Sequence, residues 1–224
     1  MQYIDLSITI QSNMPYYPGD PAPSVAPALT IAEDGCHVMH LNIGSHTGTH
    51  VDAPSHFIPG GKTIDTIPLD RFIGRGLIIS LPNLNEYHSI SLSDISPYAD
   101  KLADADIVLF HTGWMDKAGT DAFYKHPVIS KEVAKLLAAS QIKAVGVDML
   151  NVDKTCLGEE LYAEGSMAAH EILLGNDILI IENLTNLSAV DFDNPTILFF
   201  PLAICGGDGS PVRAIATDIP CPFN

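Results

Sequence analysis

Three histidines and an aspartate gather in one short segment, SHTGTHVDAPSHF, at residues 45–57. The four side chains are those of His46, His50, Asp52 and His56. They are separated by even numbers of positions, so all four would point the same way if the segment were extended. A helix is disfavoured, because Gly48, Pro54 and the β-branched residues near them oppose it. We therefore expect a strand or loop that presents four metal-binding groups on one side.

The spacing also predicts a bend at Gly48. In a straight strand, which rises about 3.3 Å per residue, the Cα atoms of His46 and His50 would lie roughly 13 Å apart. That separation is too large for both imidazoles to bind one ion comfortably. Gly48 lies midway and can adopt backbone angles closed to other residues, so we expect a bend or bulge there.

The residue types indicate which metals suit the segment. Imidazole and carboxylate together favour zinc, manganese or ferrous iron, whereas magnesium and calcium prefer oxygen ligands alone. No cysteine lies nearby, which disfavours softer ions. The alternative, four hydrogen-bonded polar groups in an ordinary loop, requires the shared spacing to be a coincidence.

Two further candidate ligands lie late in the chain. A helix is expected over Ser166–Leu174, with His170 on the same face as the two leucines that follow it. His170 should therefore be buried and need a polar partner. Glu182 ends the apolar run ILII, where a carboxylate requires pairing or a cation. Taken singly, a hydrogen-bonded core histidine and a solvated strand end remain open alternatives.

The chain as a whole predicts a single acidic domain. Its 224 residues are 46% hydrophobic, enough to bury one substantial core, and no stretch resembles a linker. The net charge of −16 argues against nucleic acid or an anionic membrane surface as partner. We expect no secretory leader and no membrane span, since the most apolar window, 197–205, is too short. Four scattered cysteines favour reduced thiols and a cytoplasmic location: Cys36, Cys156, Cys205 and Cys221.

Short apolar runs alternate with two or three helical patterns, which predicts an α/β fold. The expected strands are Tyr3–Ile10, Val38–Ile43, Leu77–Leu81, Ile107–Phe110, Ala144–Val147, Ile178–Ile181, Thr196–Phe200 and Val212–Ala216. Ser130 is expected to cap one helix, and Gly175 to end the helix from Ser166. The pattern over 91–102 is a weaker helical candidate.

The histidine-rich motif is one of several strings that match a known family. The others are DLSITI near the start, YPGDP (17–21), HTGW (111–114), GVDMLNVD (146–153), ENLTNL (182–187) and DGSPVRA (208–214). Together they resemble the metal-dependent cyclase family, which includes bacterial kynurenine formamidases and isatin hydrolases. The likeness covers nearly the whole chain, and HTGTHVDAPSHF is its most specific part.

The resemblance carries expectations for fold, assembly and site. It implies a compact single α/β domain over 1–224, of the swivelling β/β/α type, with a twisted, partly barrel-like mixed sheet flanked by helices. It also implies a homodimer or homotetramer with the site near a subunit interface. The resemblance further implies one or two divalent ions, zinc or manganese. The first would be held by His46, His50 and Asp52. The second would be bridged by Asp52 and completed by His170 and Glu182, and His56 would be the proton-transfer residue.

These groups favour hydrolysis at a metal centre. A cation with open positions lowers the pKa of bound water from 15.7 toward ~7 and polarises a carbonyl oxygen. With His56 moving the proton, the predicted reaction is cleavage of a C–N amide bond in an aryl formamide, or in a cyclic imide or lactam such as an isatin-like ring. Tyr17 and Phe57 are candidates for an aromatic pocket, and Arg213 for a substrate carboxylate, with core packing or a salt bridge as the alternatives.

The sequence leaves the substrate open. Formamidase-like members tend to carry a tryptophan before PGD and a Thr-Pro-Ser-type run after GVD, where this chain has Tyr17 and Met149–Asn151. Asp148 and Asp208 are weaker candidates to approach the pocket, and a turn role is at least as plausible for Asp208.

Two other function classes are open at this point. His50 and Asp52, with His111 or His170, fit the facial triad of non-haem iron oxygenases, but this leaves His46 and His56 without a role. A family member that binds metal without catalysis is the second alternative, although every expected site position is filled.

Overall fold

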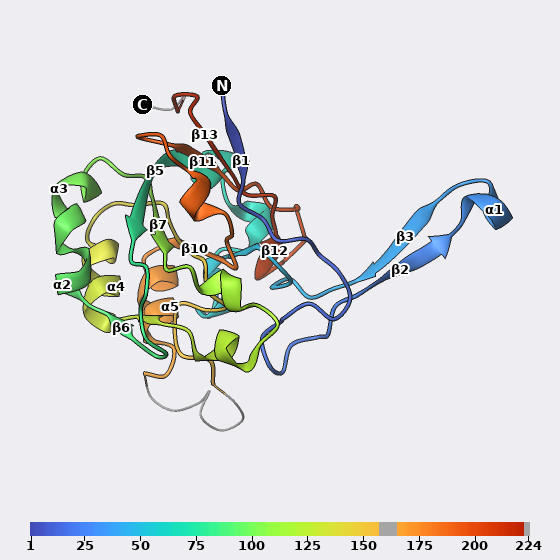
Figure 1. Cartoon of the computed structure of the whole chain (residues 1–224), viewed down its shortest axis with the longest axis horizontal. Coiled ribbons are helices and arrows are strands. Elements are labelled where there is room, and N and C mark those ends of the chain that lie inside the picture. The colour runs from blue at the N-terminus through green and yellow to red at the C-terminus, as the bar shows by residue number, and fades with distance from the viewer. Residues whose placement is uncertain (157–164, 222–224) are drawn as a thin grey trace.

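A nine-stranded mixed sheet forms the centre of the protein, in a computed structural model that describes residues 1–156 and 165–221 (Figure 1). Its strands are β1 (Tyr3–Asp5), β4 (His50–Asp52), β5 (Ile73–Ser80), β7 (Ile107–His111), β9 (Ala144–Val147), β10 (Leu179–Glu182), β11 (Thr196–Leu198), β12 (Gly209–Pro211) and β13 (Ile215–Thr217). They lie in the order β1-β13-β11-β5-β7-β9-β10-β4-β12. The four strands from β5 to β10 run parallel, and the strands outside them pair antiparallel. The predicted α/β class with a twisted, partly barrel-like mixed sheet is confirmed.

Each face of this sheet is covered by a separate hydrophobic core. On one face pack the helices α4 (Lys131–Ala138) and α5 (Ala168–Gly175), and the other core includes the first strand and the segments around Phe72 and Phe199. Neighbouring residues of β10 divide between them, with Ile180 in the first core and Ile181 in the second. Strands buried on both faces are apolar throughout, which is why the central strands appear as continuous hydrophobic runs. Within the described residues, no helix combines the length and apolar character needed to cross a membrane.

The helix predictions hold with adjusted bounds. The Ser130 side chain accepts a hydrogen bond from the backbone of Val133 and caps α4 as expected. The second helix begins at Ala168 rather than Ser166 and includes Gly175. The 91–102 candidate is broken into α2 (Leu92–Ile95) and α3 (Ala99–Leu102), with a 3-10 turn between them at Ser96–Tyr98. Proline at 97 explains the break, because its ring removes a backbone donor.

The strand predictions locate most of the sheet and miss its short members. Every expected strand contains or overlaps an observed one, but the first covers only Tyr3–Asp5 and the last is shifted to Ile215–Thr217. Four strands were not expected: β2 (Ser24–Leu29), β6 (Ser89–Ile90), β8 (Val128–Ile129) and β12. They are short or lack buried residues in alternation, so their sequences carry little periodic signal.

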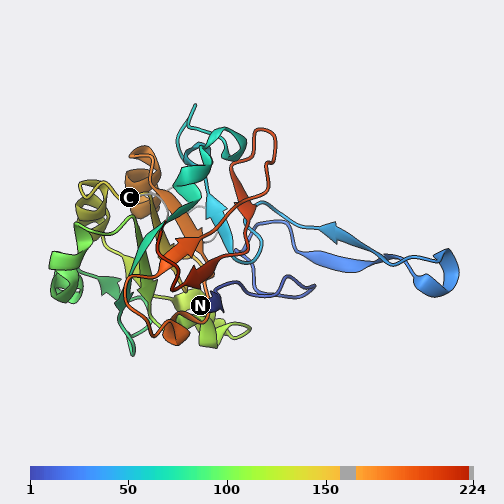
Figure 2. The same cartoon turned by 90° about the horizontal axis from the view of Figure 1, so that it is seen from above.

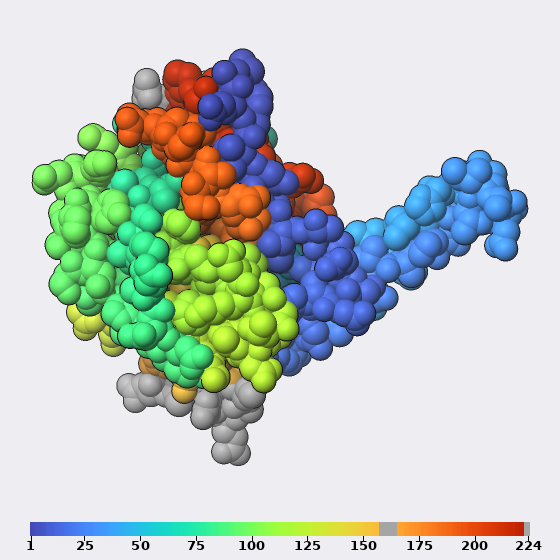
Figure 3. Space-filling model, in the orientation of Figure 1, coloured from blue at the N-terminus to red at the C-terminus, as the bar shows by residue number. Residues whose placement is uncertain are grey.

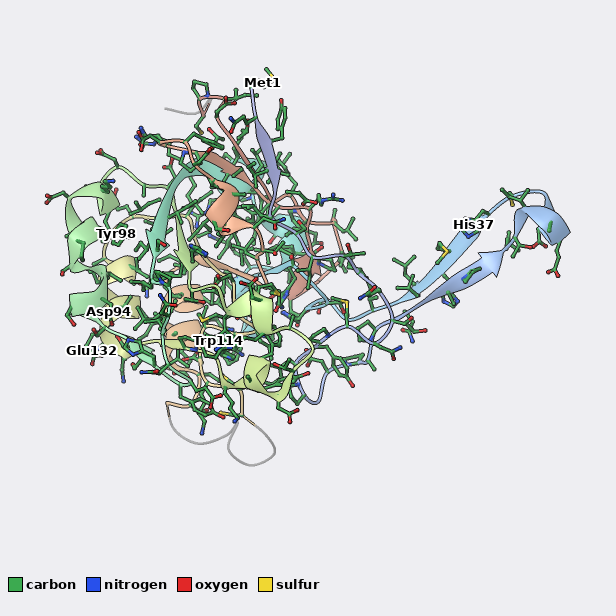
Figure 4. The ribbon with its side chains drawn as sticks, viewed as in Figure 1. Met1, His37, Asp94, Tyr98, Trp114 and Glu132 are labelled. Atoms are coloured by element: carbon green, nitrogen blue, oxygen red, sulfur yellow. The ribbon has the colours of Figure 1, made fainter. Side chains whose placement is uncertain are left out.

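A two-stranded hairpin projects from the domain. It consists of β2, the short helix α1 (Ile31–Asp34) and β3 (Val38–Asn42), and we call residues 24–42 the hairpin arm. Figures 2 and 3 show the arm extending away from the body, and Figure 4 shows His37 on it, far from Trp114 in the body. Every residue of β3 is exposed. The arm is a separate two-stranded sheet, and an isolated hairpin is at best marginally stable in water, so the arm lacks the packing that stabilises the nine-stranded sheet.

Candidate metal centre

The histidine-rich motif bends at Gly48, as its spacing predicted. Gly48 has a φ of 70°, in the left-handed region. Only His50–Asp52 is a strand, and the chain then enters a 3-10 helix at Pro54–His56 with proline at its first position. The segment is thus part strand and part loop, as expected, and the additional turn at Pro54 arises because proline favours the start of a helical turn. The two bends together fold the motif back on itself.

This folding brings all four side chains of the motif together. The ring centroid of His46 lies 5.0 Å from that of His50 and 4.0 Å from that of His56. Asp52 is the common neighbour: its Oδ1 lies 2.8 Å from His46 Nδ1 and 3.3 Å from His50 Nε2. The cluster predicted from sequence spacing is present in three dimensions.

His170 and Glu182 join the same cluster from other elements. The register of β10 against β4 places Glu182 opposite His50. The Nε2 atom of His170, on α5, lies 3.5 Å from Glu182 Oε1 and 3.5 Å from Asp52 Oδ2. Both side chains are buried, at 2% exposure for His170 and 5% for Glu182. Neither a solvated strand end nor an isolated core histidine describes them.

One oxygen at the middle of this cluster lacks a hydrogen-bond partner. Asp52 Oδ2 is buried and accepts no hydrogen bond, a costly arrangement for a carboxylate. Among the described residues, two trios have donor atoms within 4.8 Å of one another, His46–Asp52–His56 and His50–Asp52–Glu182, and Asp52 belongs to both. An unpartnered buried oxygen among imidazoles and a second carboxylate fits a divalent cation, and the nitrogen and oxygen donors fit zinc or manganese.

The pKa shifts of the cluster also indicate a site for a cation. Burial acts to lower the pKa of His50, but hydrogen bonds to Asp52 and Glu182 outweigh it and raise that pKa to about 10. The pKa of His170 is likewise raised to about 10, against burial, by Asp153 and Asp52. Burial would raise the pKa of Asp52, yet the charge of His46 and the hydrogen bonds of the histidines hold it well below its usual range. The carboxylates thus stabilise positive charge at this place, which a bound cation supplies as well as protons do.

Backbone and carboxylate acceptors orient the two most buried imidazoles of the cluster, those of His50 and His170. His50 Nδ1 donates to the carbonyl oxygen of Gly48 at 2.8 Å, so the bend itself orients the ring. His170 Nδ1 lies 2.9 Å from Asp153 Oδ2. In both rings the Nε2 atom is left facing Asp52 and Glu182, the arrangement in which a histidine binds a metal through one nitrogen while the other donates.

His56 lies at the edge of the cluster, beside Asp208. Its Nδ1 atom is 3.3 Å from Asp208 Oδ2, and the same carboxylate oxygen lies 3.0 Å from His46 Nε2. Burial lowers the pKa of His56 to about 4, so its ring is neutral at pH 7. Sequence reasoning gave Asp208 only a weak signal, because its partners are more than 150 residues away along the chain.

A cavity of about 400 Å³ opens beside the cluster. His46, His50, His56, His170 and Glu182 all contribute to its wall. Tyr17 and Phe57 line it, as the sequence suggested, together with Leu150 from the Met149–Asn151 stretch and with Met167, which the sequence did not suggest. Phe57 also stacks on His170 at a centroid distance of 4.6 Å. Asp20, from the YPGDP turn, is a further wall residue.

Arg213 is not brought to this cavity. Its guanidinium binds both carboxylate oxygens of Asp5, at 2.8 and 2.6 Å, and its side chain is 76% exposed. The structural salt bridge that the sequence left open is the arrangement present.

His111 and Asp148 also lie away from the cluster. His111 lines a separate cavity of about 1000 Å³, with its Nδ1 atom 3.2 Å from Ser80 Oγ. A facial triad of His50, Asp52 and His111 therefore does not form. Asp148 accepts hydrogen bonds from the backbone of Thr112 and Gly113 and so anchors the HTGW turn.

A buried set of imidazoles and carboxylates beside a small cavity, on a mixed sheet, defines an α/β protein with the donors of a divalent metal site. The chain belongs to the cyclase family, whose model, described as putative cyclase, matches residues 4–154. The family resemblance indicated by the sequence motifs is thereby confirmed.

Individual relatives agree with this assignment. The chain is 31% identical to a kynurenine formamidase of Bacillus cereus over 220 residues, which is 97% of this chain and 98% of the relative. Isatin hydrolase A from Labrenzia aggregata superposes with a TM-score of 0.84 at 22% identity, covering 96% of this chain and 93% of the other. A structure described as a potential metal-dependent hydrolase with cyclase activity gives a TM-score of 0.76 at 27% identity, covering 96% of each chain.

Proposed function

We propose that this protein is a metal-dependent hydrolase that cleaves a C–N amide bond. Its substrate is an aryl formamide, or a cyclic imide or lactam with an isatin-like ring. The observation that carries the proposal is the buried, unpartnered Oδ2 of Asp52 among three imidazoles and Glu182. The kynurenine formamidase relative and the structural likeness to isatin hydrolases support the choice of bond.

The ligands would divide into two sets that share Asp52. His46, His50 and Asp52 would hold the first divalent ion, and Asp52, His170 and Glu182 a second. Zinc and manganese suit this donor set. When bound, such an ion makes water a stronger acid and polarises the substrate carbonyl.

The protein's own groups supply proton transfer and orientation. His56 is neutral at pH 7 and can therefore accept a proton, with Asp208 placed 3.3 Å from its Nδ1 to stabilise the charged ring. The same proton can pass to the leaving nitrogen. Phe57 and Leu150 offer apolar surface for an aromatic substrate. On this proposal the cavity holds the substrate and the histidine–carboxylate cluster carries out the reaction.

The reaction is tested by removing and restoring metal. Protein treated with a chelator, then supplied with zinc or manganese, is assayed against formanilide, N-formylkynurenine, phthalimide and isatin by absorbance. We expect hydrolysis of at least one of them only after metal is restored, without oxygen consumption. Failure to hydrolyse any of the four with either metal would contradict the proposal, and oxygen uptake on addition of ferrous iron instead would favour the iron oxygenase alternative.

We propose further that the chain assembles as a homodimer or homotetramer with the centre near the interface. The hairpin arm supports this, because its exposed large apolar residues are unpartnered within one chain: Leu29, Ile31, Val38, Met39 and Leu41. The arm also begins four residues after Asp20 and ends four before His46, both in the cavity wall. A second copy lying on the base of the arm would therefore approach the cavity.

Sedimentation velocity tests the assembly. Wild type should sediment as a dimer or tetramer, and Leu41→Glu should shift it toward monomer, whereas Leu69→Glu, at a large exposed residue outside the arm, should not. A wild-type chain that remains monomeric at high micromolar concentration would contradict the proposed assembly. A cytoplasmic location is likewise proposed, supported by four cysteines that are scattered along the sequence without a C-x-x-C pair.

A further inference from the structure

We propose that Asp153 is a positioning residue that fixes which nitrogen of His170 faces the metal centre. The inference rests on the proposed function, in which His170 is a ligand. Asp153 lies in the loop between β9 and α5 and is itself 6% exposed. Sequence reasoning did not single it out, although it ends the GVDMLNVD string.

The Asp153 carboxylate is occupied by three donors from the start of α5. Its Oδ1 accepts a hydrogen bond from the backbone of Ala169 at 2.9 Å. Its Oδ2 accepts one from the backbone of His170 at 2.9 Å and lies 2.9 Å from Nδ1 of the same residue. One carboxylate thus holds both the main chain and the side chain of His170.

The helix depends on this carboxylate for its cap. Met167 precedes α5 and provides no side-chain hydrogen bond to it. The first amides of a helix need acceptors, and a negative charge there is favourable. Asp153 supplies both from outside the helix, which ties α5 to the loop that precedes it.

The hydrogen bonds of Asp153 also decide which nitrogen of His170 can bind a metal ion. Both Asp153 oxygens accept backbone N–H groups, so His170 Nδ1 must donate to Oδ2 and keep its proton. With a metal ion bound, Nε2 would be the nitrogen that presents its lone pair, and it lies 3.5 Å from Asp52 Oδ2 and 3.5 Å from Glu182 Oε1. A metal ligand needs that lone pair, and carboxylates beside histidine ligands fix them in this way.

The same loop holds the other ligand of the second set. Val152, next to Asp153, donates its backbone N–H to Glu182 Oε1 at 3.1 Å. Asn151 Oδ1 in turn accepts the backbone N–H of Asp153 at 2.6 Å and closes the loop. Residues 151–153 therefore position both His170 and Glu182, while the first set of ligands is oriented by the bend at Gly48.

Asp153→Asn tests the inference with the smallest change of shape. Its amide offers one accepting oxygen instead of two and carries no negative charge, so either Ala169 or His170 loses its acceptor and the His170 ring loses the charge beside it. We expect the affinity for the second zinc ion to fall by about 10–100-fold while the first is retained. Zinc is titrated into the full chain and counted by elemental analysis, and ¹⁵N NMR reports which His170 nitrogen is protonated.

Asp148→Asn is the matched control. Asp148 is a buried carboxylate from the same string that accepts backbone hydrogen bonds but contacts no proposed ligand. It should keep the affinity for both zinc ions and the His170 tautomer, even if it lowers thermal stability. A loss of the second ion in both variants would show that general destabilisation is responsible and would overturn the inference.

The outcomes separate this inference from the proposed function. If Asp153→Asn keeps the wild-type affinity for the second zinc ion, the inference is wrong. If the wild type binds only one zinc ion, the second ligand set is wrong, and a His170 Nδ1 without a proton would overturn the role of Asp153 as well. Should Asp153→Asn not fold, a zinc-loaded wild type with the proton on Nε2 would refute the inference by itself.

Discussion

Replacing Gly48 with alanine should weaken both the fold and the metal site. A non-glycine residue in the left-handed region costs about 1–2 kcal/mol. The added Cβ atom would also meet Ile10 Cγ1 at 3.2 Å and Met14 Cε at 3.4 Å, so these side chains must shift slightly. We therefore expect Gly48→Ala to lose roughly 1–3 kcal/mol of unfolding free energy.

The effect on metal affinity follows from the same strain. The bend sets His46 and His50 at a ring distance of 5.0 Å, and the Gly48 carbonyl oxygen accepts the His50 Nδ1 proton. If the variant relaxes the bend, metal binding must restore it. A cost of about 1–2 kcal/mol then weakens zinc affinity by roughly 5–30-fold.

Gly119→Ala provides the matched control. Gly119 has a φ of 84° and open space around its Cβ position, and it lies far along the chain from the motif. It should lose stability through backbone strain alone and keep its zinc affinity. Urea unfolding of chelator-treated protein measures the first quantity, and zinc competition with a chromophoric chelator measures the second. A Gly48→Ala protein that binds zinc as tightly as Gly119→Ala would refute the role given to the bend.

Three further predictions concern single side chains. His56→Ala should keep its metal and lose ~10²–10⁴ in turnover, and loss of the metal instead would make His56 a ligand, as its place in the trio with His46 and Asp52 allows. Arg213→Ala should keep kcat/KM within about twofold, because its partner is an exposed surface carboxylate; a large rise in KM would restore it as a substrate residue. His126 is buried, and burial lowers its pKa in the folded protein to about 4. Between pH 6.5 and 4 the unfolded chain therefore binds more protons than the folded one, so the free energy of unfolding decreases as the pH falls through this window. The full decrease is about 3 kcal/mol. His126→Gln should show a smaller fall in its urea midpoint between pH 7 and 4.5 than wild type, and equal falls would contradict this.

Local sequence patterns predicted the elements whose burial is continuous. The strand Ala144–Val147 was expected with its observed bounds, because a parallel strand covered on both faces is apolar at every position. The hairpin strand Ser24–Leu29 was missed, since it contains proline and no buried residue. Its structure depends on pairing with β3, which propensity alone does not reveal.

The site could be predicted to a similar extent. The motif from His46 to His56 was evident from residue types and spacing, and Gly48 from the distance that the imidazoles must bridge. His170 and Glu182 were found because polar groups were expected at buried positions. Asp208 and Asp153 were not assigned, because their contacts with histidines arise only when distant segments meet in the folded chain.

The central claim is that a divalent cation is held at Asp52 and is required for hydrolysis. The most direct test measures two quantities in wild type and Asp52→Asn, both purified without added metal. The first is the metal content per chain, and the second is the rate of formamide and lactam hydrolysis. The account predicts zinc or manganese in the wild type, and loss of both metal and activity in Asp52→Asn. Wild-type hydrolysis that survives exhaustive chelation, or full metal content in Asp52→Asn, would contradict it.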